Sequence, residues 1–308
     1  MSDLIKKTEL SDSKDCPCAS AQPILKRLIT REAKIGEDLT IRRALPHQER
    51  RMIGAWCFFD HFGPLNLKAS GLNIAPHPHM GLQTFTWTLH GEILHRDSLG
   101  SEQVIKPGQV NLMNSGAGIS HSEESLPDSI LHGVQLWIAL PDSKRFMDPD
   151  FNHYATVPYV LHDHLFIHIL AGEFLGQQSP AKIYSPLMGL EIYAQEDTES
   201  VLPLNPKFEY GILPLVGEIE VEGELIDLTT LLYLGCGRKE LNIKLKKGAR
   251  ILVIGGEPFQ EEILIWWNFV ARSEDELIKA VDDWNNHTRF GEVHGYQGEP
   301  LTAPQMKR

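Results

Sequence analysis

The chain has 308 residues, and 42% of them are hydrophobic, which is enough for a sizeable core. At this length we expect two domains. Lys and Arg total 29 against 41 Asp and Glu, a formal net charge of -12 at pH 7, which argues against direct binding to nucleic acid or to an anionic membrane. Four cysteines without a regular framework indicate a reducing compartment. No segment has the pattern of a signal peptide or a membrane helix, so we expect a cytoplasmic protein.

The first part of the chain is predicted to be a flexible tail over residues 1–22, because it is polar and irregular. Cys16 and Cys18 lie in this tail, too close together for an easy disulfide and without a second pair for zinc. Short strands are predicted at residues 39–42 and 55–59. The Asp60-His61 pair that follows is interpreted as a hydrogen-bonded turn rather than as metal ligands.

Two histidines stand at the centre of the most informative stretch, residues 75–93. Side chains of an extended segment alternate faces, so His77 and His79 point the same way. By the same parity we expect them to face the interior shared by Phe85, Trp87 and Leu89, with Thr84, Thr86 and Thr88 on the outer face. Buried imidazoles need partners, and a metal ion is a common one.

A second pair follows the turn predicted at residues 106–109. His121 and Glu123 again stand two apart, on one face with Ile119. Three neutral imidazoles and one carboxylate leave a divalent ion with a net positive charge, which attracts an anionic oxygen ligand. The pattern therefore favours a catalytic metal site over histidines that only hydrogen-bond within the core.

Four segments resemble one family: IRRALPHQERRMIGAWCFFDHFGP, HPHMGLQTFTWTLHGEILHRDSLG, PGQVNLMNSGAGISHSE and VQLWIALP. They look like the pirins, bicupin proteins with a mononuclear iron, and the resemblance runs from about residue 24 to about 294. It implies an all-β fold of two antiparallel, jelly-roll-type barrels packed together, with Fe(2+), or another divalent ion, held by His77, His79, His121 and Glu123. Gln83 stands where most pirins have Glu, and by its parity we expect it to point toward the site.

The second half repeats the first. Residues 215–219 (LVGEI) echo residues 89–93 (LHGEI) at an offset of 126, which indicates duplication of one barrel. The positions that match His77 and His79 are Pro203 and Asn205, and residues 169–286 contain no histidine. We therefore predict an N-terminal metal-binding cupin barrel over residues 23–145, followed at 146–290 by a linker and a C-terminal cupin barrel without ligands.

Three other histidines could be mistaken for ligands. His162, His164 and His168 have metal-like spacing, but they fall in the expected interdomain connection and no carboxylate-bearing strand follows at cupin distance. Residues 92–105 predict a β-hairpin in which His95 and Asp97 hydrogen-bond without a chemical role.

The end of the chain is predicted to be a short helix followed by a tail. Ser273 and Glu276 form a capping box, and Leu277, Val281 and Trp284 follow at helical spacing. The tail, residues 291–308, is rich in Gly and Pro and is expected to lie across the first barrel.

Two classes of function follow from the resemblance. The first is an iron-dependent dioxygenase, of the quercetin (flavonol) 2,3-dioxygenase type, with a small, flat, oxygen-chelating substrate and Glu123 as catalytic base. The second is a non-catalytic iron protein whose redox state controls binding to a protein partner. A storage-type bicupin is a third, weaker interpretation. A pocket open to solvent above His77 and His121 would favour the enzyme, and a sealed cage would favour the redox switch.

Overall fold

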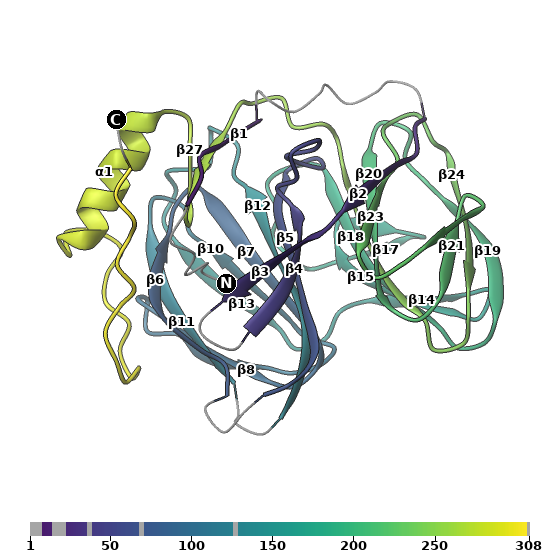
Figure 1. Cartoon of the computed structure of the whole chain (residues 1–308), viewed down its shortest axis with the longest axis horizontal. Coiled ribbons are helices and arrows are strands. Elements are labelled where there is room, and N and C mark those ends of the chain that lie inside the picture. Colours follow the sequence, from purple (N-terminus) through teal and green to yellow (C-terminus); the bar gives the residue numbers. More distant parts are fainter. Residues whose placement is uncertain (1–7, 14–22, 36–38, 68–70, 126–128, 307–308) are drawn as a thin grey trace.

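The computed structural model describes residues 8–13, 23–35, 39–67, 71–125 and 129–306. Two halves lie side by side, and each contains a seven-stranded and a four-stranded antiparallel sheet (Figure 1). One helix, α1 (Glu274–Asn285), lies at the outer side of the first half (Figure 1). The predicted all-β fold with a short C-terminal helix is thereby confirmed.

The two sheets of the first half enclose the segment that carries the candidate ligands. The seven-stranded sheet has the order β13 (Asp150–Tyr154), β10 (Val110–Asn114), β7 (Leu82–His90), β12 (Ile130–Ala139), β5 (Trp56–Asn66), β4 (Leu39–Leu45) and β3 (Arg31–Ile35). The four-stranded sheet has the order β6 (Asn73–His79), β11 (Ile119–Ser125), β8 (Ile93–Asp97) and β9 (Glu102–Ile105).

The second half repeats this arrangement. Its seven-stranded sheet has the order β14 (Tyr159–His162), β15 (Leu165–Ala171), β18 (Leu187–Ala194), β25 (Arg250–Gly256), β20 (Glu209–Val216), β23 (Thr230–Tyr233) and β2 (Lys26–Ile29). Its four-stranded sheet has the order β19 (Thr198–Pro203), β24 (Glu240–Leu245), β21 (Ile219–Val221) and β22 (Glu224–Ile226). The smaller sheets are made by β1 (Ser11–Asp12), β26 (Leu264–Trp266) and β27 (Phe269–Ala271), and by β16 (Glu173–Phe174) and β17 (Gln177–Gln178).

The duplication seen in the sequence appears as equivalent turns. Gly91 joins β7 to β8 and Gly217 joins β20 to β21, so each glycine takes the chain from a seven-stranded to a four-stranded sheet. Their φ angles are 80° and 81°, in the region that favours glycine. The buried cluster of the second half includes aliphatic side chains such as Leu202 and Ile243.

The halves are held together through their seven-stranded sheets. Phe85 and Trp87 on β7 belong to the same buried cluster as Leu213 on β20 and Leu252 on β25. Trp56 on β5 is packed there too, and its indole N–H lies 3.2 Å from the carbonyl oxygen of Gly255 in the second half. One face of β7 therefore packs on the second half, not on the candidate ligands.

This packing corrects the predicted facing of β7. Thr84, Thr86 and Thr88, expected on an outer face, are 0–5% exposed. The hydroxyl of Thr86 lies 3.4 Å from the side-chain amide of Gln135, which in turn contacts Glu123, so the threonine row faces the interior of the first half. The parity argument failed because β6 and β7 lie in different sheets, and the turn at Gly81 (φ 74°) reorients the chain between them.

Strand pairing crosses the expected domain limits. β2, early in the chain, pairs with β23 of the second half, and β13 pairs with β10 of the first. The limits 23–145 and 146–290 stay predictions. The tail expected at residues 1–22 lies mostly outside the described residues, as do Cys16 and Cys18. Within its described part, β1 pairs with β26, with Ser11 opposite Ile265.

The C-terminal helix begins at the predicted Ser273 cap, but Glu276 reaches back to the amide of Arg272 and not to that of Ser273 as in a capping box. The Ser273 hydroxyl accepts a hydrogen bond from the amide of Glu276 at 3.4 Å, and the Glu276 carboxylate accepts one from the amide of Arg272 at 3.1 Å. The tail that follows lies on the first half, where the amide of Leu301 donates to the carbonyl of Pro76 at 2.9 Å (Figure 1). The expected position of the tail is confirmed.

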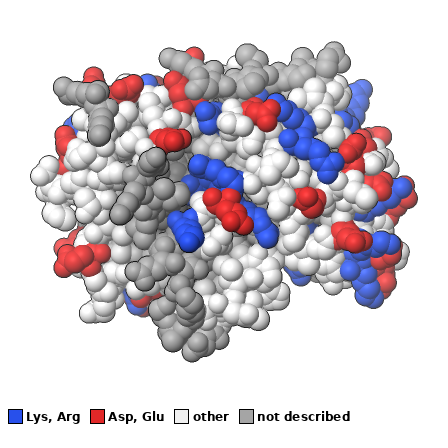
Figure 2. Space-filling view, viewed as in Figure 1, with Lys and Arg blue, Asp and Glu red and all other residues white. Residues whose placement is uncertain are grey.

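Two surface observations concern partners. On the face shown in Figure 2, acidic and basic side chains of the described residues are intermixed rather than separated into large patches of one sign. Among the described residues, no helix is long and apolar enough to cross a membrane.

Candidate metal centre

Three histidines meet in the interior of the first half. His77 and His79 come from β6, and His121 comes from the neighbouring strand β11, directly opposite His77 in the register. Their exposed fractions are 0%, 0% and 1%. One nitrogen from each ring can be chosen so that all three lie within 4.8 Å of one another. This spacing suits three ligands of a single ion.

The hydrogen bonds of two of these rings define their tautomers. Nδ1 of His77 lies 2.9 Å from the carbonyl oxygen of Ala75, and Nδ1 of His79 lies 3.2 Å from that of Asn268. A carbonyl can only accept, so each Nδ1 carries the hydrogen and each neutral Nε2 presents a lone pair. Nε2 of His77 is buried without a hydrogen-bond partner among the described residues, as a metal-binding atom would be before its ion arrives.

Burial favours the neutral rings that metal binding requires. Burial is the main cause that lowers the pKa of His77 from 6.5 to about 3. Burial likewise holds the pKa values of His79 and His121 well below 6.5, with the neighbouring imidazoles adding to the effect. All three side chains are therefore competent ligands at neutral pH.

Glu123 lies on the same strand as His121 and is 3% exposed. Its Oε1 accepts a hydrogen bond from Nε2 of Gln135 at 2.8 Å, whereas its Oε2 is buried without a partner among the described residues. A β-bulge between His121 and Glu123 interrupts the pairing with β6. Glu123 does not belong to the group of three histidines at 4.8 Å, so its role as the fourth ligand stays a prediction.

The donor set nevertheless fits a divalent cation. Imidazole lone pairs and an unpartnered carboxylate oxygen are costly to bury unless a cation or a hydrogen-bond donor pairs with them. These residues can hold such an ion in the way the sequence predicts.

His121 has a side-chain partner where the other two histidines have backbone partners. Its Nδ1 lies 3.2 Å from Nδ1 of His95, and Nε2 of His95 lies 3.0 Å from Oδ2 of Asp97. Burial raises the pKa of Asp97, but the hydrogen bonds from His95 and Ser101 outweigh it and hold that pKa below its usual value. Reasoning from sequence gave His95 and Asp97 no chemical role. The signal available there was their i, i+2 spacing, the same as in the two predicted ligand pairs.

The expectation that Gln83 points toward the site is wrong. Its Nε2 donates a hydrogen bond to the carbonyl of Lys182 at 2.9 Å, in the second half of the sequence. Gln83 shares its face of β7 with Phe85 and Trp87, which pack on the second half. The same turn at Gly81 explains this difference.

The other histidine groups have structural partners. Asp60 and His61 lie within β5 and not in a turn, with Asp60 2.8 Å from the Arg43 guanidinium and His61 2.9 Å from His132. His168 contacts the buried Glu191 at 2.8 Å. His162 and His164 belong to no group with metal-like spacing in the part of the chain that the structure describes.

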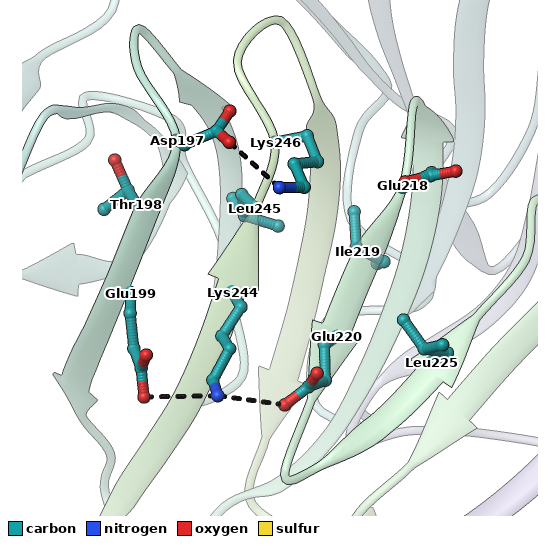
Figure 3. Close-up of a pocket in the computed structure, with 10 residues that line it drawn as sticks. All are labelled: Asp197, Thr198, Glu199, Glu218, Ile219, Glu220, Leu225, Lys244, Leu245 and Lys246. Atoms are coloured by element: carbon teal, nitrogen blue, oxygen red, sulfur yellow. Dashed lines mark hydrogen bonds and ion pairs between the residues drawn. The ribbon is translucent and has the colours of Figure 1, made fainter.

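Two cavities lie outside this centre. One of about 390 Å³ lies on the four-stranded sheet of the second half, where Lys244 bridges Glu199 and Glu220 (Figure 3). The other, of about 780 Å³, lies on the first half and is lined by residues that include Arg43, Phe58 and Trp267. Neither cavity is lined by the three histidines or by Glu123.

An aromatic pair connects the larger cavity with the histidines. Phe58 lines the cavity and stacks on Trp137 with ring centroids 3.9 Å apart. Trp137 meets the His79 ring edge-on at 5.2 Å. Two ring contacts, Phe58 with Trp137 and Trp137 with His79, therefore lie between that cavity and a candidate ligand.

The fold and site together define a bicupin protein with a candidate histidine metal centre in its N-terminal domain. The comparisons with known proteins agree. The Pirin family model matches residues 38–138, and the model of the Pirin C-terminal cupin domain matches residues 189–291. The chain belongs to the pirin family, as the resemblance implied.

Individual relatives cover nearly the whole chain. A Pseudomonas aeruginosa protein named "Putative quercetin 2,3-dioxygenase" is 47% identical, over 99% of this chain and 98% of its own length. A "Pirin-like protein" from Caulobacter vibrioides is 35% identical, over 80% and 88%. The crystal structure of a quercetin 2,3-dioxygenase from Acinetobacter baumannii is 49% identical and superposes with a TM-score of 0.90, covering 92% of this chain and 96% of that one.

Proposed function

We propose that this protein is a metal-dependent dioxygenase of the quercetin 2,3-dioxygenase type, with Fe(2+) held by His77, His79, His121 and Glu123. The observation that carries the proposal is the convergence of the three buried imidazoles, two of which turn Nε2 lone pairs inward because of their backbone partners. The names of the relatives at 47% and 49% identity support the reaction class.

The ion, when bound, supplies the means to pass electrons from an electron-rich substrate to dioxygen. The chain's own residues would prepare that substrate. Oε2 of Glu123 has no partner among the described residues, and Glu123 would accept the proton of a substrate hydroxyl when it transiently leaves the ion. The Gln135 amide holds Oε1 at 2.8 Å and so fixes the direction of the carboxylate. Glu123 is the residue to which we assign the role of catalytic base.

The interior also offers polar groups to a small, flat, oxygen-bearing substrate such as a flavonol. The indole N–H of Trp137 and the hydroxyl of Thr88 are buried and have no hydrogen-bond partner among the described residues. Trp137 lies against His79, so its N–H can donate to a ligand that approaches the centre. Its ring also supplies an apolar surface for an aromatic molecule. We also propose that the protein acts in the cytoplasm, as the sequence predicts.

One observation favours the second candidate function, an iron protein that senses redox state and acts through a protein partner. The four side chains are at most 3% exposed, and neither cavity reaches them. Turnover requires that a substrate reach these buried side chains, and the Phe58–Trp137 pair lies between one cavity and His79. A regulatory iron would need no such passage.

Metal analysis followed by oxygen uptake separates the two functions. The apoprotein is loaded with Fe(2+) without oxygen, and uptake is then measured with a panel of flavonols and enediols. The dioxygenase proposal predicts uptake by the wild type, loss of both iron and uptake in His121→Ala, and retained iron with strongly reduced uptake in Glu123→Gln. A fully iron-loaded wild type that consumes no oxygen with any of these compounds would contradict the enzyme and favour the regulatory protein.

A further inference from the structure

We propose that Asp97 and His95 are positioning residues that set the tautomer of His121, so that its Nε2 presents a lone pair to the ion. This inference rests on the proposed metal site. It assigns a role to two buried residues outside the predicted ligand set, with exposed fractions of 1% and 4%.

The need for such a device follows from the partner of His121. His77 and His79 face backbone carbonyls, which can only accept. His121 faces Nδ1 of another imidazole at 3.2 Å, and that nitrogen can either donate or accept. The hydrogen bond alone therefore leaves two arrangements of the proton between His95 and His121.

Only one of these arrangements allows His121 to bind metal. If Nδ1 of His121 donates to His95, Nε2 of His121 keeps its lone pair. If Nδ1 of His95 donates instead, a neutral His121 carries its hydrogen on Nε2 and can donate it to Nε2 of His79, which lies 3.1 Å away. That second arrangement uses both nitrogens for an internal hydrogen bond and leaves His121 unable to serve as a ligand.

Asp97 selects the first arrangement. Its Oδ2 lies 3.0 Å from Nε2 of His95, and a carboxylate only accepts, so the hydrogen of His95 is on Nε2. With a single ring hydrogen, His95 then has a bare Nδ1, which must accept from Nδ1 of His121. The Asp97 carboxylate thus fixes the hydrogen of His95 on Nε2, and His95 in turn fixes the hydrogen of His121 on Nδ1. Outer partners of metal-binding histidines act in this way.

The two positioning residues are themselves held in place. Oδ1 of Asp97 accepts hydrogen bonds from the amides of Leu99 at 2.9 Å and Ser101 at 3.0 Å, which leaves Oδ2 for His95. The His95 ring stacks on Phe151 with centroids 4.3 Å apart and planes within 8°. Stacking holds the plane of the His95 ring, and the hydrogen bonds fix its flip, because a flipped ring would place carbon at both hydrogen-bonding positions.

The variant Asp97→Asn tests directly whether Asp97 sets the positions of the hydrogens on His95 and His121. The Asn oxygen can keep the two backbone hydrogen bonds of the turn, while its amide places a donor opposite Nε2 of His95. This reverses the proton arrangement and hydrogenates Nε2 of His121. We expect the affinity for Zn(II), used as a diamagnetic probe and measured by chelator competition, to fall by about 10- to 100-fold.

A matched control is Asp227→Asn in the second half. Oδ1 of Asp227 accepts from the amide of Thr229 at 2.8 Å in a similar turn, without a histidine on its other oxygen. We expect its Zn(II) affinity to equal that of the wild type. Equal loss in both variants would show that the effect of Asp97→Asn comes from turn stability, and would overturn the positioning role.

A second background separates positioning from packing. His95→Phe keeps an aromatic ring against Phe151 but removes the imidazole between Asp97 and His121. In that background, Asp97→Asn should cause no further loss of Zn(II) affinity, because its effect passes only through His95. An undiminished effect of Asp97→Asn in the His95→Phe protein would contradict the proposal.

The wild type alone gives a direct readout that does not depend on any variant. In the Zn(II)-loaded protein labelled with ¹⁵N-histidine, NMR should show His95 with hydrogen on Nε2 only and His121 with hydrogen on Nδ1. Hydrogen on Nδ1 of His95 would overturn the proposal.

If His77→Ala binds Zn(II) as tightly as the wild type, the metal site itself is wrong. If His77→Ala loses Zn(II) and Asp97→Asn does not, only the positioning role fails.

Discussion

The carbonyl oxygen of Asn268 lies 3.2 Å from Nδ1 of His79, so a candidate ligand of the first half is oriented by backbone that follows the second half in the sequence. Asn268 lies in the turn between β26 and β27, next to Trp267, whose φ is 53°. The amide of Val270 donates to the carbonyl of Met80 at 2.9 Å and ties this hairpin to the end of β6. The orientation of the candidate ligand His79 therefore depends on how the C-terminal hairpin packs against β6.

Gly81→Ala tests this dependence. A Cβ on Gly81 would lie 2.2 Å from the carbonyl oxygen of Val270, and its φ is 74°. Gly108→Ala is the control, because its φ is 84° but no atom lies within 4 Å of the added Cβ. We expect the control to lose about 1–2 kcal/mol of unfolding free energy from backbone strain. Gly81→Ala should lose about 1–3 kcal/mol more.

The two glycine variants should also differ in metal binding. Displacement of the hairpin moves Asn268 away from His79, so Gly81→Ala should bind Zn(II) more weakly, while Gly108→Ala should bind as the wild type does. Denaturant unfolding and chelator competition measure the two effects. Unchanged Zn(II) affinity in a folded Gly81→Ala protein would show that the hairpin does not support His79.

Two glutamines on opposite faces of the same sheet should have separate effects. Gln83 donates to Lys182 between the halves, and Gln135 donates to Glu123 in the interior. Gln83→Glu loses a buried donor and should cost about 1–3 kcal/mol of unfolding free energy. It should leave the optical spectrum of a Co(II)-substituted site unchanged at every pH.

Gln135→Leu is the complementary variant, because it releases the Glu123 carboxylate. We expect it to alter the Co(II) spectrum. If instead Gln83→Glu shifts the pH dependence of that spectrum, Gln83 faces the metal and the facing of β7 described above is wrong.

The paired imidazoles of His61 and His132 should make the apoprotein sensitive to acid. Burial, with a smaller contribution from neighbouring charges, lowers the pKa of His61 from 6.5 to about 3 and that of His132 to about 4. Between these values and 6.5 the unfolded chain binds protons that the folded one does not. Stability should therefore fall as the pH drops below 6.5, by up to about 1.4 kcal/mol per pH unit for each imidazole.

The measurement is the unfolding free energy of the metal-free protein from pH 7 to pH 4. A double variant, His61→Gln with His132→Gln, keeps two hydrogen-bonding side chains but cannot take up these protons. Its stability should depend less steeply on pH over this range. Equal slopes for the two proteins would mean that these histidines do not titrate as described.

Much of this architecture follows from local sequence patterns. Their spacing of two residues places the candidate ligands His77 and His79 on one face, and the repeated Gly91 and Gly217 turns reveal the duplication. Which face of β7 points to the interior could not be predicted. A single glycine turn transfers the chain to another sheet, so the alternation of side chains along β6 does not continue into β7. The relations of His121 with His95 and of His79 with Asn268 depend on cross-strand register and on a contact between residues 189 positions apart. No local pattern encodes either one.

The ligand assignment predicts which histidines control metal stoichiometry. His121→Ala should lower bound iron more than tenfold, because it removes a predicted ligand. A protein with both His162→Ala and His164→Ala should keep the wild-type iron content, since these side chains lie in the second half and outside the histidine group. Comparable losses in the two proteins, measured by metal analysis after loading, would contradict the assignment.

Crystals of the Fe(2+)-loaded protein, measured at the iron absorption edge, test the central claim most directly. We predict one anomalous difference peak per chain, between Nε2 of His77, His79 and His121 and within coordination distance of Glu123. A peak elsewhere, for example beside His168 and Glu191, or a peak at the three histidines that Glu123 does not reach, would contradict the four-ligand centre.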